Sequence, residues 1–355
     1  MIQLSGKLLS RIAYLPLLAV ITLLSACSSS ITPAVKNVNI QPTRMPPSAS
    51  PIAGITNSTI EPNQYPITTP TTQNYLNNTS TIMPSDSTSV VEFDTPTQLS
   101  PDDWMALPII PSISQNAISI YQRGLAMGND PHAFSKIGDC QSIPTYFLSY
   151  FDLPGYYDLG SFSSLQQTID WYSGSFSRES LAVKGGFNAA AILSPLRADP
   201  QQCEATENPI ECEFRLHHPS VVIISLEEWW AGHPENYETY MRQILDYTIQ
   251  QGVVPIIATK ADNLEGNNLI NQTVAKLANE YDIPLWNFWL AVQSLPNHGL
   301  MAYTSSGDVD MFHLTHSEGY YFYNDPANTE SGWSIRNLTA LQSLDAVRRA
   351  LTENP

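Results

Sequence analysis

Two kinds of apolar pattern alternate along residues 101–355 of the chain. The stretches "SVVIISL" (220–226) and "VVPIIAT" (253–259) are continuously apolar, which is typical of strands buried in a parallel sheet. Shorter apolar stretches predict two more strands, at 133–139 and 283–289. Between the strands, apolar residues recur at helical spacing. The predicted helices cover 117–128, 164–176, 236–252, 269–282 and 337–351.

This alternation predicts an α/β fold for residues 101–355: a doubly wound, mainly parallel sheet with helices on both faces. Ligands of such folds bind beyond the carboxyl ends of the strands. The first predicted strand ends at Gly138, Asp139 and Cys140. Cys140 is therefore expected at an edge of the sheet where ligands bind.

The first 26 residues contain the successive regions of an export signal, in the usual order. Lys7 and Arg11 precede a short apolar stretch, which falls short of the roughly 20 residues that span a bilayer. The end of this stretch, "LSAC", resembles the lipobox of bacterial lipoproteins, which implies that Cys27 is lipidated. Ser28 after it resembles an outer-membrane address. An ordinary signal peptide is the alternative. We expect an exported protein, lipid-anchored to a membrane of the cell envelope at its outer or cell-surface face.

Residues 27–100 are rich in Ser, Thr, Pro and Asn. Such a composition buries too little apolar surface to offset the entropy of ordering, so it predicts a disordered tether. The formal net charge of −17 argues against a nucleic-acid partner. No glycine-rich phosphate loop follows a predicted strand. We expect no cofactor, and no pattern indicates an oligomeric state.

The cysteines have different predicted roles. Cys203 and Cys212 flank the polar stretch "CEATENPIEC" in an exported chain, so we expect a disulfide between them. A metal site would need more Cys or His at ligand spacing, and we expect none. Cys140 is left over, and it is either buried and inert or kept for its reactivity.

Asp310 and His313 form a D-x-x-H pattern near the C-terminus. Together with Gly138-Asp139-Cys140, and with segments such as "GGFNAAAIL" and "ATKADN" in the same order, this pattern resembles the SGNH or GDSL-type hydrolases. The resemblance covers the predicted α/β region and implies a flavodoxin-like sheet. It implies that Cys140 is the nucleophile, His313 the general base and Asp310 the residue that orients it.

Asp139 and His316 lie close in the sequence to the predicted catalytic residues. Asp139 would oppose thiolate formation unless its carboxylate faces backbone hydrogen bonds. His316 lies past the position that matches the family's histidine, so we expect it at the rim of the site.

The chain departs from the family in two places. Cys140 replaces a serine, and the Gly-x-Asn-Asp that follows the strand at 220–226 is missing, with Glu228 and Trp229 near its position. The lost asparagine would donate to the oxyanion, and losing one such donor costs roughly a hundredfold to a thousandfold in rate. Gly186 and Asn188, after a further predicted strand, are candidate replacement donors. Close backbone packing is the alternative explanation of the glycines.

Trp229 and Trp230 offer a second interpretation, because exposed aromatic rings stack on sugars. Core packing is the alternative for at least one of the two. A glycosidase is disfavoured, since the adjacent Glu227 and Glu228 would point in opposite directions on an extended strand end.

Three hypotheses remain. The first is a hydrolase of acyl esters, on a small molecule or a glycan, acting through Cys140, His313 and Asp310. The second is an inactive SGNH-like fold that binds a carbohydrate or another partner. The third is a thiol-based redox or acyl-carrying role for Cys140, against which the absence of a C-x-x-C counts. The first is slightly favoured over the second.

Overall fold

The computed structural model describes residue 100 and residues 102–226, 236–304, 307, 309–310 and 312–353. The predicted signal peptide, Cys27 and nearly all of the predicted tether lie outside these residues. Glu228 and Trp229 also lie outside them.

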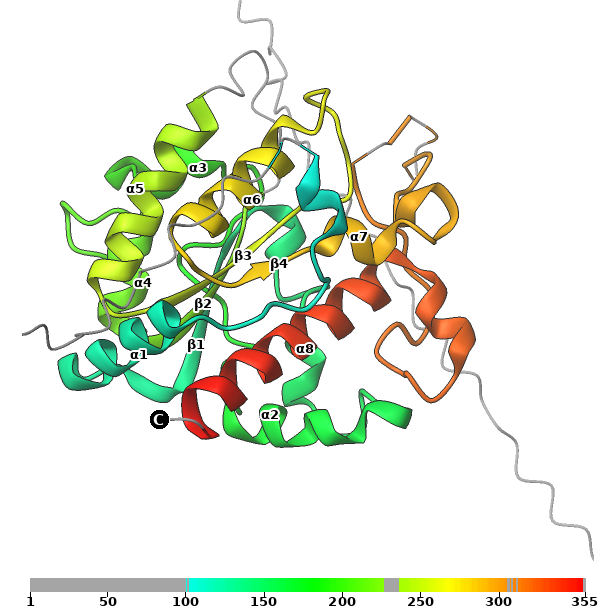
Figure 1. Cartoon of the computed structure of the whole chain (residues 1–355), viewed down its shortest axis with the longest axis horizontal. Coiled ribbons are helices and arrows are strands. Elements are labelled where there is room, and N and C mark those ends of the chain that lie inside the picture. The colour runs from blue at the N-terminus through cyan, green and yellow to red at the C-terminus, as the bar shows by residue number, and fades with distance from the viewer. Residues whose placement is uncertain are drawn as a thin grey trace, which may run out of the picture. The chain divides into compact units, whose positions relative to one another are not determined.

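The centre of the fold is a four-stranded parallel sheet in the order β1-β2-β3-β4 (Figure 1). All residues of β2 and β3 are buried, as their continuous apolar runs predict. The strands are β1 Asp130–Gly138, β2 Pro219–Ser225, β3 Val254–Ala258 and β4 Leu285–Trp286.

A single parallel bridge extends this sheet beyond β1. Gly138 pairs with Ser225 of β2 and also with Val183, which therefore lies on the side of β1 away from β2. After β1 the chain first forms the bridge at Val183 on one side of β1 and then forms β2 on the other side. This change of side is the reversal of strand order that defines a doubly wound sheet. The predicted fold class is confirmed, and the reversal lies at the end of β1, where Cys140 follows.

Helices cover both faces of the sheet (Figure 1). On one face α1 and α8 pack against each other and against strands, and on the other face α5 and α6 do the same. The helices are α1 Gln115–Met127, α2 Gln166–Trp171, α3 Ala189–Ile192, α4 Pro209–His217, α5 Asn236–Gln250, α6 Leu269–Glu280, α7 Phe288–Val292 and α8 Gly332–Glu353. Among the described residues, none of these helices has the length and apolarity needed to cross a bilayer.

Three segments differ from the sequence prediction. Helix α4 was not predicted, although Asn208 and Glu211 form a capping box at its start. The predicted strand at 283–289 is only two residues long, because Asn287 accepts the N–H of Leu290 and starts α7. The predicted helix at 164–176 is shortened to α2, which follows a 3₁₀ segment.

Candidate functional site

Strand β1 ends in a turn that admits no side chain at Gly138. A Cβ atom there would lie 2.1 Å from Oγ of Ser142 and 2.8 Å from the carbonyl oxygen of Ser225. These distances are shorter than any van der Waals contact, so only glycine allows β1 to pack against the end of β2. The turn that carries Cys140 is therefore held tightly against the sheet.

Asp139 starts the short 3₁₀ turn Cys140–Ser142. Its side chain is fully buried, and Oδ1 accepts the backbone N–H of Gln141 at 2.9 Å. The carboxylate thus faces a backbone hydrogen bond, which is the condition under which Asp139 does not oppose thiolate formation at Cys140. Cys140 itself is partly exposed and is not part of a disulfide, so reagents and substrates have access to this turn.

His313 and Asp310 form the hydrogen-bonded pair that the D-x-x-H pattern predicts. Oδ2 of the buried Asp310 lies 2.7 Å from Nδ1 of the partly exposed His313. Oδ1 accepts the backbone N–H groups of Phe312 and His313, each at 3.0 Å. Burial alone would raise the pKa of Asp310, but these hydrogen bonds hold it below its usual value.

This geometry fixes the chemistry of the imidazole. An ionised Asp310 accepts a hydrogen bond from Nδ1–H, which leaves Nε2 as the ring nitrogen with a free lone pair when His313 is neutral. A histidine in this tautomer is oriented to take a proton from a neighbouring group at Nε2. The pair therefore has the arrangement of a general base and its orienting carboxylate.

A direct hydrogen bond joins the two predicted segments. The residue after Cys140, Gln141, donates from Nε2 to the carbonyl oxygen of Phe312 at 2.9 Å, and Phe312 immediately precedes His313. The phenyl ring of Phe312 packs edge-on against the His313 imidazole at 5.0 Å. The structure thus brings together two segments that are 171 residues apart in the sequence. The exposed His316 lies beyond this junction.

Arg336 of α8 lies at the end of β2, next to the Cys140 turn. It was not among the predicted site residues. The side chain is fully buried, and Nη2 donates to Oγ of Ser225 at 2.7 Å. Its guanidinium carbon lies 4.9 to 6.0 Å from the centres of four aromatic rings, an arrangement that favours a cation. The rings are those of Phe147, Trp286, Phe288 and Trp333. The sequence offered no clear signal for it, because the buried part of α8 also carries other polar residues such as Asn337, Thr339 and Arg348.

The segment with Gly186 and Asn188 differs from its prediction. The strand expected before Gly186 is reduced to the bridge between Val183 and Gly138. Gly186 has φ 81° and a Cβ atom there would meet nothing within 4 Å, so backbone conformation and not close packing explains this glycine. Oδ1 of Asn188 caps α3 by accepting the N–H of Ala191 at 2.9 Å. Oxyanion binding by either residue stays a prediction.

Cys203 and Cys212 form the predicted disulfide, with a Cα–Cα distance of 5.3 Å. Cys212 lies in α4 and not at the end of a polar loop as expected. Glu207 lies near both sulfur atoms, but their bond to each other removes the thiolates that a metal would need. The bridge therefore ties the segment before α4 to the helix.

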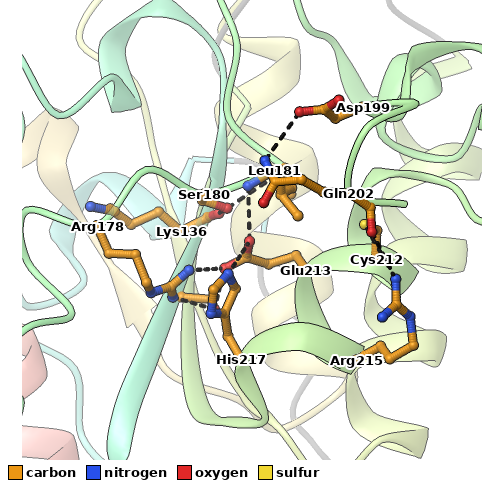
Figure 2. Close-up of polar contacts among 12 residues, drawn as sticks. Lys136, Arg178, Ser180, Leu181, Asp199, Gln202, Cys212, Glu213, Arg215 and His217 are labelled. Atoms are coloured by element: carbon orange, nitrogen blue, oxygen red, sulfur yellow. Dashed lines mark hydrogen bonds and ion pairs between the residues drawn. The ribbon is translucent and has the colours of Figure 1, made fainter. Parts of the chain in front are cut away.

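Glu213, the residue after Cys212, is fully buried and joins three parts of the chain (Figure 2). It accepts hydrogen bonds from Ser135 Oγ in β1 at 2.6 Å, from Arg178 Nη1 at 2.7 Å and from the backbone N–H of Leu181 at 2.8 Å. Leu181 is two residues before Val183, which bridges to the end of β1. Glu213 thus holds the 178–183 segment along β1 and indirectly supports the Cys140 turn.

Lys136 of β1 lies nearby (Figure 2). Its Nζ donates to the carbonyl oxygen of Phe176 at 2.7 Å. Burial and the positive charge of Arg178 lower the pKa of Lys136 from 10.5 to about 7, although Glu213 opposes the shift. Above pH 7 the folded protein therefore holds a neutral amine in its interior.

This lysine predicts a pH dependence of stability. Between pH 7 and 10.5 the unfolded chain binds a proton at Lys136 that the folded chain has released. The free energy of unfolding should therefore rise with pH in this window, by up to about 1.4 kcal/mol per pH unit. We expect Lys136→Met to lose this rise in urea unfolding at pH 7, 8 and 9. Lys276→Met, which removes an exposed lysine, is the control. Equal slopes in all three proteins would contradict the prediction.

No protein-family model, curated protein or solved structure matches this chain.

Proposed function

We propose that this protein is a hydrolase of acyl esters that uses Cys140 as nucleophile, His313 as general base and Asp310 as its orienting carboxylate. The observation that carries the proposal is the 2.7 Å contact between His313 Nδ1 and Asp310 Oδ2, on a segment hydrogen-bonded to the residue after Cys140. The export signal and Cys27 support a lipid-anchored protein of the cell envelope as part of the same proposal.

The proposed reaction has two steps. In the first, His313 Nε2 takes the Cys140 thiol proton, the thiolate attacks the ester carbonyl, and the tetrahedral intermediate expels the alcohol, which receives that proton. In the second, His313 takes a proton from water, the hydroxide attacks the thioester, and the carboxylic acid leaves as the Cys140 thiol is restored. Asp310 stabilises the imidazolium in both steps without taking its proton.

Alkylation of Cys140 by iodoacetamide tests the nucleophile and base directly. A free thiol with a pKa of about 8.5 is only a few per cent thiolate at pH 7, so an imidazole that takes the proton should speed alkylation by about tenfold or more. We expect His313→Ala to lose this acceleration at pH 7. The modified site is identified by mass spectrometry.

The matched control for this experiment is His316→Ala, because His316 is an exposed histidine three residues further along the same segment. It should leave the rate unchanged. Equal rates in the wild type and both variants would show that His313 does not activate Cys140, and the turn would then be a structural feature of the fold.

A further inference from the structure

A group of tyrosine side chains lies beyond the proposed catalytic residues. We use "tyrosine cluster" for Tyr146, Tyr150, Tyr156 and Tyr320. Tyr156 is 58% exposed, Tyr146 is 39% exposed, and the other two are partly exposed. Large aromatic side chains are usually buried, so several exposed in one group indicate a binding surface.

The tyrosine cluster is built from the two segments that carry the proposed catalytic residues. Tyr146 follows Cys140 by six residues, so their Cα atoms lie within about 21 Å of each other. Tyr320 follows His313 by seven residues. The Tyr320 hydroxyl contacts the carbonyl oxygen of Thr145 at 3.5 Å, which joins the segments a second time beyond the Gln141 contact. The cluster is therefore carried by the same two segments as Cys140 and His313.

Three rings of the cluster contact one another, and buried aromatic rings support the cluster. Tyr150 lies 5.8 Å from Tyr156 and 6.1 Å from Tyr320, measured between ring centres. These spacings are close to the distance between successive rings of a pyranose chain. The buried Tyr321 packs 4.9 Å from Tyr150. Tyr146 stacks at 5.4 Å and 25° on the buried Trp333. A supported ring loses little entropy when a ligand binds.

The hydroxyl groups of the cluster also lie close to one another. Tyr150 and Tyr146 lie near enough to act on the Tyr320 hydroxyl electrostatically. Burial, followed by Tyr150, raises the pKa of Tyr320 above its usual value. The cluster presents apolar ring faces next to hydroxyl donors and acceptors.

The charge of the two segments that carry the tyrosine cluster disfavours an anionic ligand. Residues 141–165 and 312–335 contain no Lys or Arg but include several carboxylates, such as Asp152, Asp158 and Glu318. An anionic ligand would find no opposite charge in them. A pocket of about 440 Å³ lies elsewhere among the described residues, and it is lined by residues of 107–114, of α6 and of 282–285.

We propose that the tyrosine cluster binds the sugar chain of an acylated, uncharged polysaccharide, so that the ester of one sugar reaches Cys140. This proposal rests on the hydrolase function proposed above, and it specifies the substrate class. Neutral sugars offer apolar ring faces for stacking and hydroxyls for hydrogen bonding, which matches both properties of the cluster.

Binding of unesterified hexasaccharides tests the proposal without requiring hydrolysis. The full-length chain with Cys140→Ala is titrated by calorimetry with cello-, xylo-, manno- and chitohexaose, in a detergent without a sugar headgroup. We expect at least one to bind, and Tyr150→Ala to weaken its binding by about tenfold or more, which corresponds to about 1.4 kcal/mol. Tyr150→Phe, which keeps the ring, should retain most of the affinity.

The control is Tyr281→Ala, which removes a partly exposed tyrosine at the end of α6. Thermal unfolding of each variant separates lost binding from lost folding. Failure of all four sugars to bind at millimolar concentration, or equal affinity in the Tyr150 variants, would overturn the proposal. Binding of tetramethylammonium in place of the sugars would also overturn it and assign the cluster to a cation. Neither result depends on whether Cys140 hydrolyses small esters, which is measured separately with the wild type.

Discussion

Cys140→Ala is expected to lower kcat/KM for a small ester such as p-nitrophenyl acetate by at least about ten-thousandfold, because removal of a nucleophile eliminates the covalent pathway. Cys140→Ser should keep an intermediate rate. A serine hydroxyl requires a base, and in the proposed mechanism the His313–Asp310 pair serves it as it serves the thiol. Hydrolysis is followed by absorbance of the released nitrophenol at pH 7.

The serine variant separates the proposed hydrolase from a redox function of Cys140, since a hydroxyl has no thiol chemistry. Thermal unfolding of both variants separates a lost reaction from a lost fold. A wild-type rate in Cys140→Ala would show that another group is the nucleophile. No hydrolysis of short-chain esters by the wild type would contradict the hydrolase proposal and favour the inactive, ligand-binding alternative.

Glu213→Ala is expected to lower the free energy of unfolding by about 3–5 kcal/mol. The fully buried carboxylate accepts hydrogen bonds from Ser135, Arg178 and Leu181, and its removal leaves a largely buried guanidinium without its counter-ion. Glu213→Gln keeps the size and one acceptor oxygen, so it should cost less, about 1–3 kcal/mol. Urea unfolding at pH 7 measures both variants.

Glu280→Ala is the matched control for this prediction. Glu280 pairs with Arg242 at the surface, where both side chains are more than a third exposed, and such a pair contributes less than about 1 kcal/mol. A cost for Glu213→Ala as small as that for Glu280→Ala would show that the network around Glu213 does not stabilise the fold.

The fold was largely predictable because its strongest signals are local. The continuous apolar runs of β2 and β3 indicate buried strands whatever surrounds them, and the helical periodicity of α5 and α6 extends over several turns. Short elements were predicted less well. Helix α4 has nine residues, and its capping box was the signal that could have located it.

The candidate site was predictable only as separate motifs. The pairing of His313 with Asp310 is implied by the resemblance of their D-x-x-H pattern to the SGNH hydrolases, and the structure contains this hydrogen bond. The contact of Gln141 with Phe312 joins residues 171 positions apart, and no periodicity in the sequence reports such a contact. The same holds for Arg336 against Ser225 and for the tyrosine cluster, whose members come from two distant segments.

The packing at Gly138 has a consequence for how this site evolves. The constraint on Gly138 comes from the backbone and side chain of Ser225 and Ser142, and Asp139 is held by the backbone of Gln141. Neither constraint involves the side chain at position 140. Natural selection on the fold alone would therefore retain the Gly-Asp pair, while position 140 could change between sulfur and oxygen without rebuilding the turn. Distant relatives of this protein should be sought by that pair and by Asp310 with His313, with either cysteine or serine allowed between them.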